Sequence, residues 1–375
     1  MYPALTVLEA LKRKSEETPV AFELQYFKTL WVGGIGGIEA DLVKRMNVPF
    51  KAIPAAGVHG VGLRTLPGNL WRLSQGYKAS RRILGSFHPQ VMLFTGGYVA
   101  VPMALATQGF GRSKVASVLY VPDIEPGLAL KTLARFADRI VLTTEESRSF
   151  FPKQAGVSVA GYPVRQELLH WTREQAFQAL KLEPGLPVLL VLGGSTGALS
   201  INRALVSILP DLLQRMQIVH IAGQRNWDEV QTSTQNLAPD LSSRYHTYAY
   251  LHAEMGAALR AADLVVSRAG ASCLGEYPMF ELPAILVPYP YAWRYQQGNA
   301  EYLADQGAAV IVADADLTAQ LAGVVNDLLE NPLKLERMRS AMQRLARPQA
   351  AQQIAELLTS LAATVVPNRT ERSKL

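Results

Sequence analysis

The sequence predicts an α/β protein with two doubly wound domains, each a parallel sheet covered by helices on both faces. Short apolar runs alternate with longer amphipathic stretches along the whole chain, which is typical of such sheets. The length of 375 residues suits two domains of ordinary size better than one. Apolar residues make up 49% and charged residues 18%, so the chain can form two cores and is not intrinsically disordered.

The expected strands fall into two series, one in each half of the chain. The first series comprises Thr29–Val32, Phe50–Pro54, Val91–Thr95, Val115–Val121 and Arg139–Thr143. The second comprises Val188–Leu192, Ile218–Ala222, Tyr245–Leu251, Leu264–Ser267, Ala284–Val287 and Ala309–Val312. Helices are expected between the strands, for example at Pro3–Lys14, Gly37–Met46, Leu70–Leu84 and Gly127–Ala137.

The gap between the two series sets the domain bounds. The segment Gly161–Pro187 mixes turn residues with one short helix and is expected to connect the domains. We therefore expect an N-terminal domain at residues 1–165 and a C-terminal domain at residues 166–345. A helix at 346–362 should cross back to the first domain, and residues 363–375 should form a frayed tail.

Charge is unevenly distributed along the chain. Up to Arg165 there are 20 Lys and Arg against 11 Asp and Glu, whereas the remainder has 17 against 20. The basic first half suits either an anionic partner or a merely solvated surface. No helix-turn-helix, zinc-finger or RNP-like pattern occurs, so we expect no nucleic-acid partner.

Cysteine, histidine and hydropathy patterns exclude several classes. The single cysteine, Cys273, excludes a disulfide framework and a cysteine-based zinc site. The six histidines lack the spacing of metal ligands, so we expect no metal. No signal peptide opens the sequence, and no apolar run approaches the roughly 20 residues that span a bilayer. The protein is expected to be soluble or peripheral to a membrane, on its cytoplasmic side.

The loop Gly193-Gly-Ser-Thr-Gly197 is the sharpest motif. An apolar strand precedes it and a helix follows, so its backbone N–H groups and the helix dipole can bind an anion. Ser195 adds a hydroxyl donor. Because no lysine follows, a P-loop that hydrolyses ATP is disfavoured. The loop therefore predicts a phosphate site, with a plain tight turn as the alternative.

Three more strand-to-helix loops carry weaker signals. The pair Gly96–Gly97 opens a helix in the first half and could approach a diphosphate. Glu276 follows a strand by one small-residue loop, and its two oxygens could accept both hydroxyls of a ribose. Gln296, Gln297 and Asn299 lie at the start of a later helix, and their neutral amides could bind sugar hydroxyls. Each has a purely structural alternative, as a turn, a first-turn carboxylate or a solvated helix start.

Taken together, these loops make the sequence resemble the MurG family, the UDP-N-acetylglucosamine (UDP-GlcNAc) transferases that make lipid II for peptidoglycan. The resemblance spans most of the chain and rests on Gly96-Gly-Tyr-Val99, Gly161-Tyr-Pro-Val-Arg165, Gly193-Gly-Ser-Thr-Gly-Ala198, Arg268–Glu276 and Gln296-Gln-Gly-Asn-Ala300. It implies the GT-B glycosyltransferase fold, in which two doubly wound, Rossmann-like domains face each other across a cleft. It also implies an inverting displacement without metal or cofactor.

The resemblance assigns ligands residue by residue. The implied UDP-GlcNAc ligands are Arg165, Gly194, Ser195, Leu251, Ala271, Ser272, Glu276, Gln296 and Gln297. Among them, Ser195 would bind the diphosphate, the Leu251 backbone the uracil and Glu276 the ribose. In the first domain, Gly96, Gly97 and Tyr98 would hold the diphosphate of the acceptor.

Two departures from the family pattern bear on catalysis. The family's His-Glu-Gln-Asn is here Tyr120-Val-Pro-Asp123, so its glutamate, a candidate base, is missing. Asp123 or Glu125 is expected to serve as the base instead. The family also begins with a strand and a Gly-Gly-His loop, whereas here Met1 opens directly on a helix. We expect the upstream reading frame to encode an apolar strand and a glycine-rich loop.

The implied function is transfer of N-acetylglucosamine from UDP-GlcNAc to an undecaprenyl-diphosphate-linked N-acetylmuramyl-pentapeptide, which converts lipid I to lipid II in cell-wall synthesis. The alternatives are another UDP-sugar glycolipid synthase, a UDP-sugar epimerase, or a truncated non-catalytic protein that binds UDP-sugar or membrane. The protein is expected at the cytoplasmic face of the plasma membrane. There, aromatic and basic side chains of Leu63–Phe87 would contact anionic lipid, unless that segment is an ordinary core-facing helix.

Overall fold

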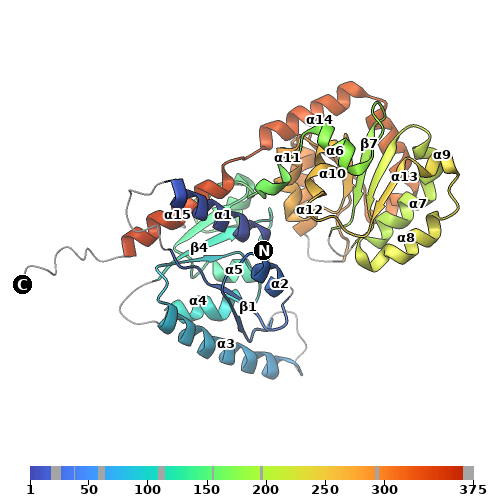
Figure 1. Ribbon diagram of the computed structural model, residues 1–375. Helices are drawn as coiled ribbons and strands as arrows, with labels where there is room; N and C mark the ends of the chain where they lie inside the picture. The colour runs from blue at the N-terminus through green and yellow to red at the C-terminus, as the bar shows by residue number, and fades with distance from the viewer. Residues whose placement is uncertain are drawn as a thin grey trace, which may run out of the picture. The chain divides into compact units, whose positions relative to one another are not determined.

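Figure 1 shows the computed structural model of the protein, which describes residues 1–17, 27–37, 39–57, 64–108, 115–153, 156–194, 197–291 and 295–365. The chain divides into two compact units. The first comprises Met1–Pro122, Pro126–Ala160 and Gln349–Leu375, and the second comprises Asp123–Glu125 and Gly161–Pro348. Residues 161–165, which the sequence placed in the first domain, therefore belong to the second unit.

The described part of the first unit contains two separate parallel sheets. One pairs β1 (Trp31–Gly34) with β2 (Phe50–Ile53). The other has the order β3-β4-β5-β6 and comprises β3 (Val91–Phe94), β4 (Ala116–Val121), β5 (Arg139–Leu142) and β6 (Val157–Val159). Strand β6 was not predicted, because the tripeptide Val-Ser-Val has no pattern that separates it from a loop.

Helices cover both sheets of the first unit. They are α1 (Tyr2–Glu17), α2 (Glu39–Arg45), α3 (Leu66–Phe87), α4 (Ala100–Gln108), α5 (Leu128–Leu133), the 3₁₀ helix η2 (Glu145–Phe150) and α15 (Ala350–Val365). Helix α15 packs against α1 and contacts β3 and β4, and the two helices share one apolar core with the sheet that includes Val7, Val118 and Ile354. The described part of α15 continues beyond its predicted end at residue 362, whereas residues 366–375 lie outside the described chain.

Helix α3 is longer than the predicted Leu70–Leu84. It begins earlier because Pro67 suits the first turn of a helix, where no intrahelical N–H is needed. It ends at His88, whose left-handed backbone (φ 49°) closes the last turn by donating its N–H to the Leu84 carbonyl. Gly76, Ser80 and Leu84 form its buried face, which packs against α4.

The second unit is a doubly wound domain around a six-stranded parallel sheet. The strands are β7 (Val188–Leu192), β8 (Gln217–Ile221), β9 (Tyr245–Tyr248), β10 (Leu264–Ser267), β11 (Ala284–Leu286) and β12 (Ala309–Ile311), in the order β12-β11-β10-β7-β8-β9. Alternate residues of β7 enter two different cores, with Val188 and Leu190 on one face and Leu189 and Val191 on the other. Both faces are therefore buried, as an uninterrupted apolar strand requires.

The helices of the second unit follow the strands in alternation. They are η3 (Gln166–Leu168), α6 (Arg173–Leu180), α7 (Leu199–Leu213), η4 (Gln224–Asn226), α8 (Trp227–Thr234), α9 (Pro239–Ser242), α10 (Met255–Ala261), η5 (Ala271–Leu274), α11 (Glu276–Met279), α12 (Tyr295–Asp305), η6 (Asp314–Asp316), α13 (Leu317–Leu329) and α14 (Pro332–Leu345). The segment Gly161–Pro187 is not the connection that the sequence predicted. Leu168, Ala176 and Leu180 are buried in the core of the second unit, and α6 packs against α10.

Two observations concern membrane spans and metal ligands among the described residues. None of their helices is both long and apolar enough to cross a bilayer. Nor do three of their His, Cys, Asp or Glu side chains gather as a metal site would require.

Candidate functional site

The strand order of the second unit predicts where a ligand binds. The chain runs from β7 outward through β8 to β9 and then returns to place β10 on the other side of β7. In doubly wound sheets, ligands bind at the carboxyl ends of the strands where the order reverses in this way. Leu192 ends β7 directly beside Ser267, which ends β10. The two loops that follow, Gly193–Gly197 and Arg268–Gly275, are the predicted diphosphate and ribose loops.

Glycines are required in the first of these loops because the backbone passes close to its neighbours. A Cβ on Gly193 would lie 2.1 Å from the Ala198 nitrogen, and one on Gly197 would lie 2.3 Å from the Ala222 carbonyl oxygen. Gly194 and Gly197 also have left-handed φ angles of 82° and 81°. The loop leads into α7, whose first N–H groups have no side-chain cap from Ala198. This arrangement leaves donors for an anion.

Ser195, the predicted diphosphate ligand, lies outside the described residues together with Thr196. Its role therefore stays a prediction. Gly194 is exposed at the edge of the described loop.

Glu276 and Arg165 are brought together at the second loop. The Arg165 Nη2 lies 3.9 Å from the Glu276 Oε1, and only 13% of the Glu276 side chain is exposed. Burial raises the pKa of Glu276 to about 7, although the nearby Arg165 guanidinium acts in the opposite direction. Arg165 also pairs with Glu167 through its Nη1 at 2.9 Å. A carboxyl group with a pKa near neutrality changes from hydrogen-bond donor to pure acceptor within the physiological pH range.

The other predicted ligands of the second unit have different settings. Leu251 is buried in the same core as Cys273 and Leu274 of η5, the short helix that also carries Ala271 and Ser272. In α12, Gln296 accepts a hydrogen bond from the Tyr289 N–H at 2.9 Å, whereas Gln297 donates to Glu301 at 2.8 Å. Gln296 therefore binds the backbone of the loop after β11 at Tyr289, while Gln297 forms a hydrogen bond within its own helix.

A cavity of about 560 Å³ opens beside the glycine loop. Its lining includes Gly193, Gly197, Ser200, Arg203, Arg225, Arg268, Tyr289, Gln296 and Asp314. Arg268 anchors one wall: its Nη1 lies 2.6 Å from the Asp314 Oδ1, and its Nη2 donates to the Ser200 Oγ at 2.8 Å. Of its three arginines, Arg203 pairs with Glu229 and Arg268 with Asp314. Arg225 and the N-terminus of α7 are therefore the groups best suited to the diphosphate of a nucleotide sugar.

Arg268, Ser200 and Asp314 were not singled out from the sequence. Arg268 lies in a segment that carried the family resemblance, but its spacing alone gave no role. Ser200 and Asp314 are far from it in sequence, so only the fold could show that the three form one network.

Asp123 is held within the second unit by Asn299. The Asn299 Nδ2 donates to the Asp123 Oδ1 at 2.9 Å, and the Asn299 Oδ1 accepts from the Ile124 N–H at 3.0 Å. Burial raises the pKa of the Asp123 carboxyl above its ordinary value, and the hydrogen bond from Asn299 opposes this shift. A carboxylate with a raised pKa is a better proton acceptor than a solvated one.

Models of two protein families match the chain. The glycosyltransferase family 28 N-terminal domain matches residues 1–142, and the family 28 C-terminal domain matches residues 188–354. A relative from Roseiflexus sp. (strain RS-1) is 38% identical over 96% of this chain and 92% of its own length. One from Desulforamulus reducens is 35% identical over 94% of this chain and 93% of its own. Both are named UDP-N-acetylglucosamine--N-acetylmuramyl-(pentapeptide) pyrophosphoryl-undecaprenol N-acetylglucosamine transferase.

The chain belongs to the MurG family of glycosyltransferase family 28.

Solved structures agree with the GT-B architecture that MurG proteins have. The crystal structure of Acinetobacter baumannii MurG aligns with a TM-score of 0.72, covers 96% of this chain and 95% of its own, and is 24% identical. A putative UDP-N-acetylglucosamine 2-epimerase from Listeria monocytogenes aligns with a TM-score of 0.67 at 13% identity. At such identities the likeness shows the fold alone. The sequence-based prediction of fold class and family is confirmed.

In the first unit, the predicted acceptor residues follow β3. Gly96 and Gly97 have left-handed φ angles of 101° and 83°, and the Tyr98 side chain is 49% exposed. A Cβ on Gly96 would lie 3.3 Å from the Leu130 side chain, so packing explains this glycine in part. Nothing crowds a Cβ on Gly97. Its φ alone favours glycine, and the role of the loop toward an acceptor stays a prediction.

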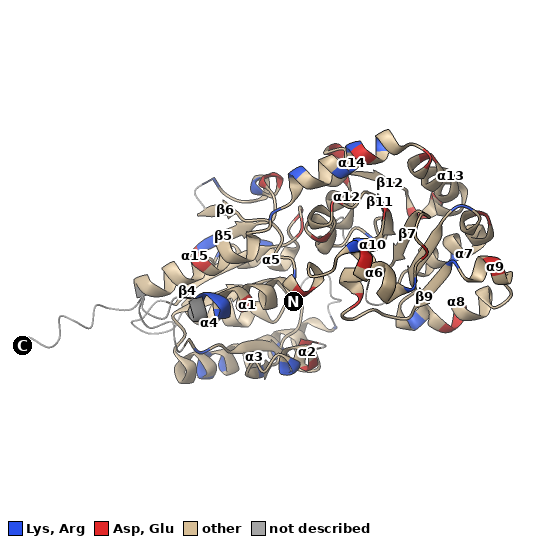
Figure 2. Cartoon of the chain, turned by 45° about the horizontal axis from the view of Figure 1, so that its top comes forward, with Lys and Arg blue, Asp and Glu red and all other residues tan. Residues whose placement is uncertain are grey.

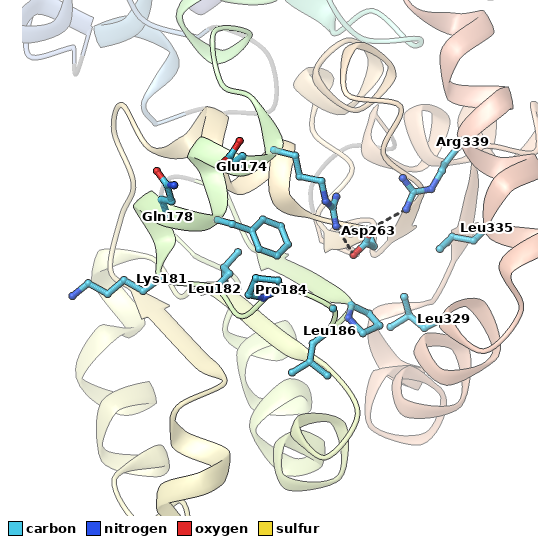
Figure 3. A pocket seen from close by; sticks show the side chains of 14 residues that line it. Glu174, Gln178, Lys181, Leu182, Pro184, Leu186, Asp263, Leu329, Leu335 and Arg339 are labelled. Atoms are coloured by element: carbon cyan, nitrogen blue, oxygen red, sulfur yellow. Dashed lines mark hydrogen bonds and ion pairs between the residues drawn. The ribbon is translucent and has the colours of Figure 1, made fainter.

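A larger cavity, of about 890 Å³, lies at the opposite edge of the second unit's sheet. Figure 3 shows Arg339 aimed at Asp263, which directly precedes β10. Asp263 also pairs with Arg173 and accepts the Val188 N–H at 3.0 Å, so it ties α6, α14 and β7 together. Because this cavity lies at the amino ends of the strands, we assign it a structural role.

Proposed function

We propose that this protein transfers N-acetylglucosamine from UDP-GlcNAc to an undecaprenyl-diphosphate-linked N-acetylmuramyl-pentapeptide, which converts lipid I to lipid II in peptidoglycan synthesis. The observation that carries the proposal is the match over nearly the whole chain to relatives whose names state this reaction. The loops at the switch point of the second unit support it, because they combine an anion site with a buried carboxyl group.

The donor binds to the second unit in this proposal. Ser195, Gly194 and the first N–H groups of α7 hold the diphosphate, while Glu276 accepts hydrogen bonds from the ribose hydroxyls. The Leu251 backbone, Ala271 and Ser272 complete the uridine site, and Gln296 and Gln297 contact the sugar.

The reaction is a direct displacement with inversion. The acceptor hydroxyl oxygen forms a bond to C1 of the sugar while the bond from C1 to the diphosphate oxygen breaks. Negative charge develops on the leaving UDP, and the first N–H groups of α7 stabilise it. A cation is not required for this step in the proposal, because the N-terminus of α7 and Arg225 of the cavity lining supply positive potential.

The proton of the acceptor hydroxyl passes to a carboxylate. The sequence left Asp123 and Glu125 as candidates, and the structure favours Asp123. Its carboxylate is fixed by Asn299, and burial raises its pKa. A fixed base with a raised pKa suits proton abstraction near neutral pH.

The acceptor is lipid-linked, so the first unit should contact a membrane. In α3, Leu70 and Trp71 are 50% and 65% exposed. Figure 2 marks the Lys and Arg positions along this helix in blue, and Arg72, Arg81 and Arg82 are exposed. Exposed apolar anchors beside basic residues are typical of helices that lie on anionic bilayers. We propose that α3 binds the cytoplasmic face of the plasma membrane.

The test is a transfer assay with purified protein, radiolabelled UDP-GlcNAc and a short-chain lipid I analogue. Label should appear in the lipid product, with UDP-glucose and UDP-galactose as poorer donors. Conversion of UDP-GlcNAc to another UDP-sugar without acceptor would instead indicate an epimerase. Donor binding without either product would contradict the proposed activity.

A further inference from the structure

Asn299 of α12 is a fully buried polar residue, with an exposed fraction of 0%. Its amide therefore bonds to groups of the protein and not, as its place at a helix start indicated, to sugar hydroxyls. Its side chain joins three segments of the second unit. The Nδ2 donates to the Asp123 Oδ1 at 2.9 Å and to the Ala269 carbonyl oxygen at 3.0 Å, while the Oδ1 accepts from the Ile124 N–H at 3.0 Å. A buried amide with every bond satisfied rigidifies the groups that it joins.

The orientation of this amide follows from its partners. A backbone N–H can only donate and a backbone carbonyl can only accept, so Ile124 fixes the amide oxygen and Ala269 fixes the nitrogen. The second N–H of Asn299 then points at Asp123, whose carboxylate can only accept. Aspartate at position 299 would have no N–H to donate, and serine has a single hydroxyl donor. Asparagine is therefore the residue that meets all three partners at this side-chain length.

Packing reinforces the contact. Ile124 is 8% exposed and belongs to the main core of the second unit. Its Cβ lies 3.8 Å from the position that a Cβ on Gly298 would take, which is an ordinary van der Waals distance. The short segment 123–125 is thus fixed against α12 by one apolar side chain and by two hydrogen bonds to Asn299.

The third partner extends the network to the donor loop. Ala269 lies in the loop after β10, two residues before Ala271 and directly after Arg268 of the cavity wall. Asn299 therefore connects the proposed base to the loop that carries the proposed uridine ligands. One side chain sets the distance between the groups that bind the donor and the group that receives the proton.

We propose that Asn299 is a positioning residue for catalysis, which fixes the Asp123 carboxylate relative to the loop after β10 that contains Ala269. This inference rests on the proposed function, in which Asp123 is the base. It predicts that Asn299 acts on the rate of transfer through Asp123 and has little effect on nucleotide binding.

The test is a double-mutant cycle on the full chain. Asn299→Ala should lower kcat by roughly 10- to 100-fold, as expected for a misplaced catalytic group. Asp123→Ala should lower kcat by about 100-fold or more, as expected for loss of a general base. If Asn299 acts through Asp123, adding Asn299→Ala to Asp123→Ala should change kcat by less than about twofold. Calorimetric affinity for UDP should change by less than about threefold in each variant.

A swapped pair guards against simple misfolding. Asn299→Asp places two carboxyl groups face to face and should lower kcat strongly. Adding Asp123→Asn restores a donor and an acceptor between the two positions but no donor for the Ala269 carbonyl, so part of the thermal stability lost in Asn299→Asp should return while kcat stays low. Asp123→Asn alone should keep UDP affinity and lose kcat.

The outcomes separate the two claims. One contrary outcome is that Asn299→Ala lowers kcat by the same factor in the unmodified chain and in the Asp123→Ala variant. Such a result would mean that Asn299 has a structural role independent of Asp123, and it would overturn the inference. Full activity of Asp123→Asn would do the same, because the carboxylate would then not be the base. No transfer by the unmodified chain would contradict the proposed function itself.

Discussion

Donor affinity should depend on pH through Glu276. In the free protein, burial raises the pKa of this carboxyl to about 7. The ribose hydroxyls need an acceptor, so the ionised form is the form that binds. The sign follows directly: affinity should increase as pH rises through 7, and binding at lower pH should release a proton.

The size of the effect follows from the ionised fraction. With a pKa of about 7, about a tenth of Glu276 is ionised at pH 6 and about nine tenths at pH 8. If the ionised form alone binds, the dissociation constant should fall roughly tenfold between these pH values, which is about 1.4 kcal/mol. This change of the dissociation constant with pH should depend only weakly on salt, because the Glu276 side chain is only 13% exposed.

The assay is isothermal titration calorimetry with UDP-GlcNAc. This ligand is preferable to UDP, because its phosphates do not titrate near neutrality. Glu276→Gln is the matched control and should bind weakly with no pH dependence between 6 and 8. Arg165→Gln should move the dependence to higher pH, because the Arg165 guanidinium favours the ionised carboxylate. A flat wild-type profile, or an unchanged slope in Glu276→Gln, would refute the reasoning.

Four further predictions concern stability, the diphosphate, metal and membrane. Burial lowers the pKa of His220 to about 4, whereas its unfolded pKa is about 6.5, so the native state should lose stability as pH falls below 6.5, by roughly 2 kcal/mol at pH 5. Hydrogen exchange of β8 peptides should show this loss, and His220→Leu should not. Ser195→Ala should weaken UDP binding by about 1–3 kcal/mol in calorimetry, and an unchanged affinity would remove Ser195 from the donor site. Transfer should continue in EDTA, since the proposed diphosphate site uses N–H groups and arginine; strict dependence on Mg²⁺ or Mn²⁺ would contradict that site. Replacing Arg81 and Arg82 with Glu should reduce cosedimentation with anionic vesicles and leave neutral vesicles unaffected, whereas equal binding to both vesicle types before mutation would argue against an anionic surface.

Strand positions were the most predictable feature of the fold. Apolar runs such as Val188–Leu192 and Leu264–Ser267 match β7 and β10, because a strand buried on both faces leaves an uninterrupted apolar signal. Helix ends were less predictable: the start of α3 depends on Pro67, and its end depends on a left-handed His88 that no periodicity reveals. Segment Gly161–Pro187 was misread because its polar turns hide buried side chains such as Leu168.

The candidate site was predictable where one loop carried the signal. Glycines 193 and 197 could be found because close backbone approach demands glycine, and a strand and helix flank them. Asn299 could not be assigned a partner, since the residues that it contacts lie far away in sequence. The raised pKa of Glu276 was also hidden, because burial is a property of the folded unit.

The division of the chain between the two units has a consequence for its synthesis. The second unit occupies an almost continuous stretch, Gly161–Pro348, whereas the first is completed by α15, which follows it. On the ribosome, the second unit can therefore fold before α15 has been synthesised. At that stage α1, β3 and β4 lack the contacts that α15 makes with them. Until α15 emerges, the core that contains Val7 and Val118 lacks the side chains of Ile354, Ala355 and Leu358, and such an incomplete core favours contact with other chains and chaperones. The order of translation makes the first unit, although it begins first, the later of the two to finish folding.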